Sequence, residues 1–405
     1  YVPEHRIIKI DSEYCFYYDI NEFYVDTLDG EVIADFINEI YVPYYERFGN
    51  SFDGFFTDEP QISRNGIPWS FILPEEYEKA YGEPIFDHLI ELFIERGEWQ
   101  QTRMNFWKLV TELFSKNYNK QIYDWCEAHG LMLTGHMMEE PTLRSQTAAL
   151  GEAMRSSRGF DLPGIDMLCA SFEFTTAKQC QSSVHQYGRP GVLSELYGVT
   201  SWDCDFRTYK HDGDWQAAMG VTVRVPHLAW VSMEGEAKRD YPASIGYQSP
   251  WYKEYPYVEN HFARVNTALT RGKPSVNVGV IHPVESYWLA YGPSQNTASM
   301  RTQLENNFTN IINWLLKGCI DFDFISESLL PDQHGENKNN KLNVGEMNYS
   351  AIVVPPVITI RGTTVDILTD FAKNGGKVIF LGACPKCVDA EESDKCKQLY
   401  ELSQK

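Results

Sequence analysis

The sequence contains no apolar run of the roughly 18 residues that a membrane-spanning helix needs. Basic residues are also scarce, since 35 lysines and arginines stand against 56 aspartates and glutamates, for a net charge of −21. Such a charge repels phosphate backbones and anionic lipid surfaces. We therefore expect neither nucleic acid nor a membrane among the partners of this protein.

Sequence motifs of several other enzyme classes are absent. No His-x-His occurs, although a metal-dependent amidohydrolase would need one at its first strand. The last third of the chain lacks a Gly-x-Gly-x-x-Gly loop after its first predicted strand, and it lacks a Gly-x-Ser-x-Gly or Gly-x-Cys-x-Gly elbow. We therefore expect no required cofactor, and neither nucleotide binding nor nucleophilic catalysis in that part of the chain.

The nine cysteines are an odd number, and most lie inside apolar runs, such as Cys15, Cys126, Cys169 and Cys319. This pattern predicts reduced core thiols and slightly favours the cytoplasm over an oxidising compartment. Cys384 and Cys387 have the spacing of a zinc half-site or a redox pair, but no second pair completes four ligands. The chain begins with Tyr1 and without a signal-peptide pattern, so its N-terminus looks cut and export stays open.

Apolar and aromatic residues are plentiful, at 43% and 14%, and aromatic rings can stack on sugar rings as well as fill a core. Short apolar runs alternate with helical patterns over residues 1–272, which is typical of a (β/α)8-type TIM barrel. The predicted strands are 23–29, 52–59, 131–139, 162–168, 191–197 and 221–230. Predicted helices cover 31–48 and 101–129, where apolar residues recur with a period near 3.6.

A second α/β pattern occupies residues 273–405. Strands are predicted over 276–283, 320–326, 351–356 and 377–382, and helices over 299–317 and 363–374. Four apolar strands separated in this way predict a small doubly wound parallel sheet. We expect this domain to be structural or to assemble homo-oligomers.

The predicted barrel strands end in Asp, Glu or His, and in a barrel such ends converge at one mouth. Hydrolysis of a glycosidic bond needs one carboxylic acid for the leaving oxygen and a second carboxylate on the other face. Asp58 and Glu59 end one strand, but adjacent side chains point to opposite faces, so we choose Glu59 as catalytic. Glu195 is a lone acid in an apolar strand. The alternative for Asp58 and Glu59 is a solvated turn. The alternative for Glu195 is a salt bridge to Arg189 or Arg207.

Further strand-end residues are candidates for binding the sugar, through hydroxyls or by ring stacking. They are Asp58, His136, Glu139, Asp166, Tyr197, Trp202, His227 and Trp230. Calcium is a candidate near Glu139, because hard cations take carboxylate and carbonyl oxygens. The alternative for His136 is an imidazole satisfied within the barrel wall.

Together the runs Phe56-Thr-Asp-Glu-Pro60, Gly135-His136 with Glu139, Leu162-Pro-Gly-Ile-Asp166, Ser194-Glu195-x-Tyr197-Gly198 and Val225-Pro-His227 resemble the glycoside hydrolase family 106 α-L-rhamnosidases. The resemblance covers roughly residues 15–270. It implies Glu59 as general acid and Glu195 as general base of an inverting hydrolysis, with calcium near the sugar. From residue 276 onward the chain resembles the flavodoxin-like or glutamine-amidotransferase-like domain that follows the barrel in such enzymes and in family 42 β-galactosidases.

Two other functions stay open. In the wider clan of barrel glycosidases, retaining enzymes use the same two strand ends, so a β-galactosidase-like enzyme with Glu195 as nucleophile is the alternative. A carbohydrate-binding barrel without turnover is the other. If residues 23–29 form the third strand, too few residues precede them for two complete βα units, so we expect the barrel to be N-terminally incomplete in this sequence.

Overall fold

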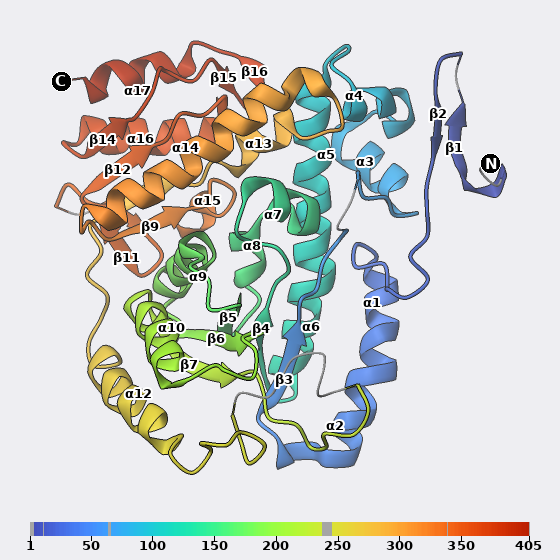
Figure 1. Ribbon diagram of the computed structural model, residues 1–405. Coiled ribbons are helices and arrows are strands. Elements are labelled where there is room, and N and C mark those ends of the chain that lie inside the picture. The colour runs from blue at the N-terminus through green and yellow to red at the C-terminus, as the bar shows by residue number, and fades with distance from the viewer. Residues whose placement is uncertain (1–3, 11, 64–65, 237–244, 338, 405) are drawn as a thin grey trace.

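The computed structural model describes residues 4–10, 12–63, 66–236, 245–337 and 339–404. Its centre is a parallel sheet of five strands in the order β3-β4-β5-β6-β7 (Figure 1). The strands are β3 (Gly54–Asp58), β4 (Met132–His136), β5 (Leu162–Leu168), β6 (Val192–Gly198) and β7 (Val221–Pro226). Among the described strands, β3 and β7 each pair with one neighbour only, so the sheet is open there, while its parallel βα order is the one predicted.

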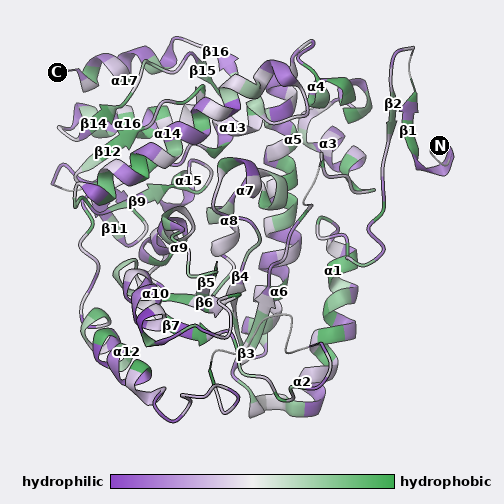
Figure 2. Ribbon diagram, in the orientation of Figure 1, coloured by the Kyte–Doolittle hydropathy of each residue, from purple (hydrophilic) through white to green (hydrophobic). Residues whose placement is uncertain are grey.

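Helices connect and cover these strands. They are α1 (Gly30–Phe36), α2 (Val42–Phe48), α3 (Leu73–Tyr81), α4 (Leu89–Phe93), α5 (Trp99–Leu113), α6 (Gln121–Ala128), α7 (Leu143–Leu150), α8 (Ala153–Ser157), α9 (Phe174–Tyr187), α10 (Phe206–Ala218) and α12 (Pro256–Leu269). Two π-helical segments, η2 (Ile37–Tyr41) and η5 (Phe114–Lys120), join α1 to α2 and α5 to α6. The helices predicted over 31–48 and 101–129 are thereby confirmed, and Figure 2 shows hydrophobic and hydrophilic stretches alternating along α10 and α12.

The strand predicted over residues 23–29 is wrong. This segment forms turns, because its aspartates bind backbone amides locally. Asp26 accepts a hydrogen bond from the amide of Leu28, and Asp29 caps α1 by accepting one from Glu31. Before it lies an antiparallel hairpin of β1 (Ile7–Ile10) and β2 (Cys15–Tyr17), which stands at the edge of the molecule in Figure 1.

The second part of the chain is built on a four-stranded parallel sheet in the order β14-β12-β8-β9. Its main elements are β8 (Val278–Ile281), α13 (Val284–Ala290), α14 (Ala298–Lys317), β9 (Phe322–Ile325), α15 (Leu330–Gln333), β12 (Ala351–Val354), α16 (Gly362–Lys373), β14 (Lys377–Phe380) and α17 (Lys395–Ser403). Short strands flank it: β10 (Leu342–Val344), β11 (Met347–Tyr349), β13 (Thr359–Ile360), β15 (Cys387–Val388) and β16 (Glu391–Glu392). All four predicted strands and both predicted helices of this part are present.

One hydrophobic cluster runs across both parts of the chain. It joins Trp107 of α5 and Leu133 of β4 to Trp288 of α13 and Phe324 of β9, each almost fully buried. Polar contacts cross the same boundary, since the indole of Trp288 donates a hydrogen bond of 2.8 Å to the Gly151 carbonyl. The second part therefore packs directly against the helices that carry the five-stranded sheet.

The thiols are unpaired, as expected, but several lie elsewhere than predicted. Cys126 is buried, whereas Cys15, Cys169 and Cys319 are exposed, so those three are not core thiols. Cys15 begins β2, while Cys169 and Cys319 follow β5 and α14, so all three lie where a regular element meets a loop. No helix in the described ranges combines the length and apolarity that crossing a membrane requires.

Candidate active site

Ionisable side chains gather at the carboxyl ends of β3 to β6. The strand register places Asp58 beside His136 and Asp166 beside Glu195. Asp58, His136 and Glu195 each offer one polar atom within 4.8 Å of the other two, and the same holds for Glu59, His136 and Asp166. Because parallel strands end at one edge of a sheet, residues as far apart in sequence as Asp58 and Glu195 share one site.

His136 belongs to both groups. Its ring is fully buried, and Nε2 lies 3.1 Å from Oε2 of Glu195 and 3.6 Å from Oδ1 of Asp58. Burial alone lowers the pKa of His136, but the hydrogen bond to Glu195 and the charge of Asp166 outweigh it, so this pKa lies above its ordinary value. His136 was expected to bind a sugar hydroxyl, and the structure shows it as a hydrogen-bond partner of Glu195.

Glu195 is held as an anion by two imidazoles. Besides His136, Nε2 of His227 lies 3.8 Å from Oε1 of Glu195. The hydrogen bond from His136 keeps the pKa of Glu195 below its ordinary value, against the opposite effect of burial. The two arginines considered from the sequence pair elsewhere, Arg189 with Asp161 and Arg207 with Asp205.

Both acids at the end of β3 face the site. The expectation that only one would do so is wrong, because regular strand alternation stops at Glu59, whose φ of 48° is left-handed. The amide of Glu59 still donates to the His136 carbonyl at 3.2 Å, which fixes the strand end beside β4. Gly135 permits this close approach, since a Cβ there would lie 2.0 Å from the Thr57 carbonyl oxygen.

Asp166 supplies the third carboxyl of the cluster. Burial, with the nearby negative charges of Glu195 and Glu59, raises its pKa to about 7, although His136 opposes this. One of its oxygens, Oδ1, is buried and has no hydrogen-bond partner among the described residues. A carboxyl in this state can donate a proton or a hydrogen bond near neutral pH.

Tyr197 does not belong to the site, contrary to expectation. Its side chain is 1% exposed, and its hydroxyl donates a hydrogen bond of 3.2 Å to the Tyr209 carbonyl in the core. The pairing of β5 with β6 skips Tyr197, because Met167 pairs with Leu196 and Leu168 with Gly198. This bulge, with a φ of 72° at Tyr197, turns its ring away from the face on which Glu195 lies.

The remaining predicted residues lie in the loops after the strands. Glu139 is exposed, has a φ of 63° and is outside both groups of ionisable residues, so calcium near it stays a prediction. Trp202 follows β6 and is 36% exposed, and Trp230 follows β7 and is half-buried. Trp230 is held by Gln248, which accepts from its amide at 3.0 Å and donates to its carbonyl at 2.6 Å.

Sequence analysis missed Glu140. Burial raises the pKa of its carboxyl to about 8, and the charges of Glu173 and Asp166 act in the same direction. The signal was present in the Glu139-Glu140-Pro141 run, of which only the first acid was considered. Glu140 thus adds a largely protonated carboxyl next to the cluster at neutral pH.

Comparisons with known proteins concern the fold. No family model matches the chain. It is 24% identical over 328 residues to a putative β-glucuronidase of Formosa agariphila, covering 78% of this chain and 26% of that protein. A rhamnosidase structure from Novosphingobium sp. PP1Y has a TM-score of 0.68 at 15% identity, over 98% of this chain and 37% of that one.

A β-galactosidase structure from Halorubrum lacusprofundi has a TM-score of 0.60 at 14% identity, over 98% of this chain and 64% of that chain. The fold and the carboxylate-lined strand ends thus define a class: the chain has the fold of glycoside hydrolases, as predicted. Within that class, the proteins it resembles are named as a rhamnosidase, a β-galactosidase and a putative β-glucuronidase. The chain spans about a quarter of the relative from Formosa agariphila and little more than a third of the rhamnosidase.

Proposed function

We propose that this chain carries the active site of a glycoside hydrolase, with Glu195 as general base and Glu59 as general acid. The observation that carries the proposal is the ionised Glu195, hydrogen-bonded to buried His136 within a cluster of further carboxyl groups. Glycosidic hydrolysis requires one ionised carboxylate and, beside it, a carboxylic acid that can donate a proton.

In the inverting reaction, Glu59 donates its proton to the glycosidic oxygen as the bond to the anomeric carbon breaks. Glu195 takes a proton from a water molecule, whose oxygen bonds to the anomeric carbon from the opposite face. His136 keeps Glu195 ionised between turnovers and fixes one of its oxygens. Asp166, with its pKa near 7, is placed to donate a hydrogen bond to a sugar hydroxyl.

An α-L-rhamnoside is the substrate we favour. The motifs at the strand ends resemble family 106 α-L-rhamnosidases, and the likeness to the Novosphingobium rhamnosidase extends over 98% of this chain. The two groups of ionisable residues bring four carboxyl groups and one histidine together. A uronate would bring another negative charge into this cluster, so a neutral sugar fits better than the substrate that the name of the Formosa protein suggests.

A retaining β-galactosidase-like reaction is the alternative, supported by the likeness to the Halorubrum β-galactosidase. Glu195 would then attack the anomeric carbon itself, and its ionised state suits that role equally well. Proton NMR of the first product anomer distinguishes the two reactions. The α-anomer from a β-galactoside, or the β-anomer from an α-L-rhamnoside, indicates inversion.

The test uses aryl α-L-rhamnoside, β-galactoside and β-glucuronide with the wild type and three variants. Glu195→Gln should abolish release. Glu59→Gln should slow substrates with poor leaving groups most, because activated aryl groups need no protonation, whereas Asp166→Asn should affect both substrate types alike. Glu78→Gln, an exposed change on α3, is the control. Release at the wild-type rate by Glu195→Gln would refute the mechanism.

Three further expectations go with this proposal. Loss of activity with a chelator and its recovery with added calcium would support a metal near Glu139. Sedimentation velocity would show whether residues 273–405 assemble homo-oligomers. If folded protein binds sugars but releases none from any aryl glycoside, the carbohydrate-binding barrel becomes the better interpretation.

A further inference from the structure

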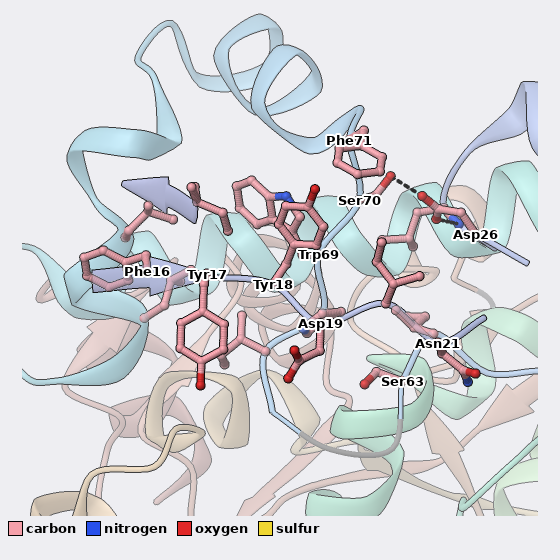
Figure 3. A pocket seen from close by; sticks show the side chains of 18 of the residues that line it. Phe16, Tyr17, Tyr18, Asp19, Asn21, Asp26, Ser63, Trp69, Ser70 and Phe71 are labelled. Atoms are coloured by element: carbon pink, nitrogen blue, oxygen red, sulfur yellow. Dashed lines mark hydrogen bonds between the residues drawn. The ribbon is translucent and has the colours of Figure 1, made fainter. Parts of the chain in front are cut away.

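A hollow lies between segments that are far apart in sequence (Figure 3). Its lining includes residues 14–21 and 24–28, residues 61–63 and 67–71 after β3, and Leu89, Ile90 and residues 92–94 around α4, and its volume is about 1160 Å³. Ligand pockets for drug-sized molecules range from about 300 to 1,000 Å³. This aromatic groove, as we call it, is therefore large enough for more than one sugar unit.

Aromatic side chains dominate one wall of the groove. Phe71 is 71% exposed and Tyr17 is 50% exposed, although large aromatic side chains are usually buried in a core. Tyr18 holds Phe71 edge to face, with 5.3 Å between ring centroids, and Trp69 lies next to them in Figure 3. Exposed ring faces of this kind suit the apolar C–H faces of sugars, at a small cost in side-chain entropy.

The polar groups of the groove are acids, amides and hydroxyls. The Asp19 side chain is 84% exposed, and Figure 3 shows it with Asn21 on the open side of the groove. Asp26 is fixed by Ser70, which donates to it at 2.6 Å. No lysine, arginine or histidine occurs among the described lining residues. Arg6 lies outside the lining, 3.7 Å from Asp19. This composition suits sugar hydroxyls and disfavours carboxylated or sulfated units.

The groove is tied directly to the end of the strand that carries Glu59. Two residues after Glu59, the amide of Gln61 donates to the Tyr24 hydroxyl at 3.1 Å. The carbonyl of Gln61 accepts from the Thr27 hydroxyl at 3.1 Å. Tyr24, Thr27 and Gln61 all line the groove. The wall of the groove therefore begins two residues after Glu59 in the chain.

We infer that the aromatic groove binds further units of a neutral oligosaccharide whose scissile bond lies between Glu59 and Glu195. This inference rests on the proposed function and adds the substrate class: a neutral glycan of several units, not a single glycoside. The aromatic rings supply most of the affinity, and Asp19, Asn21 and Asp26 select hydroxyls over acidic groups.

The test is calorimetric titration of the full chain carrying Glu195→Gln, so that bound sugar is not consumed. The probes are α-L-rhamnohexaose and β-galactohexaose, which carry the two sugars considered under the proposed function, their monosaccharides, and hexagalacturonate as the acidic counterpart. At least one neutral hexamer should bind about tenfold or more tightly than its monosaccharide. That hexamer should lose about tenfold in affinity when Tyr17→Ala and Phe71→Ala are combined.

Trp314→Ala is the matched control, because Trp314 is 65% exposed on α14, away from the groove. The Trp314→Ala variant should bind the hexamer as tightly as the chain that carries Glu195→Gln alone. Circular dichroism verifies the fold of every variant. Equal affinity for hexamer and monosaccharide, unchanged affinity in the double variant, or tighter binding of hexagalacturonate would each overturn the inference. These outcomes are independent of aryl glycoside release, which decides the proposed function separately.

Discussion

The Nε2 atom of His136, at the end of β4, lies 3.1 Å from Oε2 of Glu195, in the middle of β6. The imidazole is fully buried while the Glu195 side chain is 18% exposed, so the base faces the solvent side and its partner lies beneath it. Each group favours the charged form of the other, which lowers the pKa of Glu195 and raises that of His136.

This pairing predicts the pH profile of a His136→Asn variant. Without an imidazolium, the pKa of Glu195 should rise toward its ordinary value, so the acidic limb of kcat/KM moves to higher pH. Since Glu195 acts only when ionised, activity at neutral pH should fall by about 100-fold or less. The pH dependence of aryl glycoside hydrolysis measures both effects.

The control is His227→Asn, which removes the more distant imidazole at 3.8 Å and should shift the acidic limb less. An unmoved acidic limb in His136→Asn would contradict the assignment.

The raised pKa of Asp166, about 7, predicts a pH-dependent effect on stability. Below the ordinary carboxyl pKa the group is protonated in both folded and unfolded states, so its ionisation costs nothing. As the pH rises from the ordinary carboxyl pKa to about 7, the unfolded state ionises while burial and the neighbouring charges keep the folded carboxyl protonated, so stability is lost over this range and the loss is complete above it. Asp166→Asn should therefore raise Tm at about pH 8, by about 2 °C or more, and change it little at about pH 4.

Thermal unfolding followed by circular dichroism measures this difference. Asp58→Asn is the matched control, because the Asp58 side chain is 71% exposed and should change Tm by a similar small amount at both pH values. An equal effect of Asp166→Asn at both pH values would show that Asp166 is not destabilised by ionisation.

The sheet could be predicted because its signal is local. The run Leu162–Leu168 is a strand with the same bounds in sequence and structure, since an apolar segment between polar neighbours forms a buried strand wherever it lies. Residues 23–29 have a similar composition, but Asp26 and Asp29 bind nearby amides and form turns. Side-chain capping of this kind competes with strand pairing and is not visible in hydrophobicity.

The candidate site could be predicted only in part. Glu59, His136, Asp166 and Glu195 follow from the rule that reactive groups lie at the carboxyl ends of parallel strands, whereas Glu140 was missed and Tyr197 was wrongly included. The pairing of His136 with Glu195 depends on the spacing of strands that are not sequence neighbours. The aromatic groove could not be predicted for the same reason, because Phe16 contacts Phe93 and Tyr18 contacts Phe71, and no local pattern connects these residues.

The junction between the two parts of the chain rests on a buried ion pair. Nε of Arg155 lies 3.3 Å from Oε2 of Glu152, and both side chains are at most 5% exposed. Ser328, from the second part, donates to Glu152 at 2.8 Å and accepts from Arg155 at 3.1 Å. Glu152→Gln removes the buried counter-charge of the Arg155 guanidinium and leaves it only the exposed Glu112, so the free energy of unfolding should fall by about 3 to 5 kcal/mol.

Urea unfolding followed by tryptophan fluorescence measures this loss. Glu112 also pairs with Arg155, at 3.4 Å, but its side chain is 51% exposed. Glu112→Gln is therefore the matched control and should cost about 1 kcal/mol or less. A loss as small in Glu152→Gln as in Glu112→Gln would show that the junction does not depend on this buried charge.

The bulge at Tyr197 predicts a change in stability without a change in substrate binding. Because its hydroxyl donates to the Tyr209 carbonyl in the core, Tyr197→Phe removes that hydrogen bond and should cost about 1 kcal/mol of unfolding free energy. KM for the aryl glycoside should stay at the wild-type value. Trp202→Ala, by contrast, removes an exposed ring in the loop after β6 and should raise KM severalfold while leaving stability nearly unchanged. A raised KM in Tyr197→Phe would mean that the hydroxyl reaches the substrate, and that the bulge does not turn it into the core.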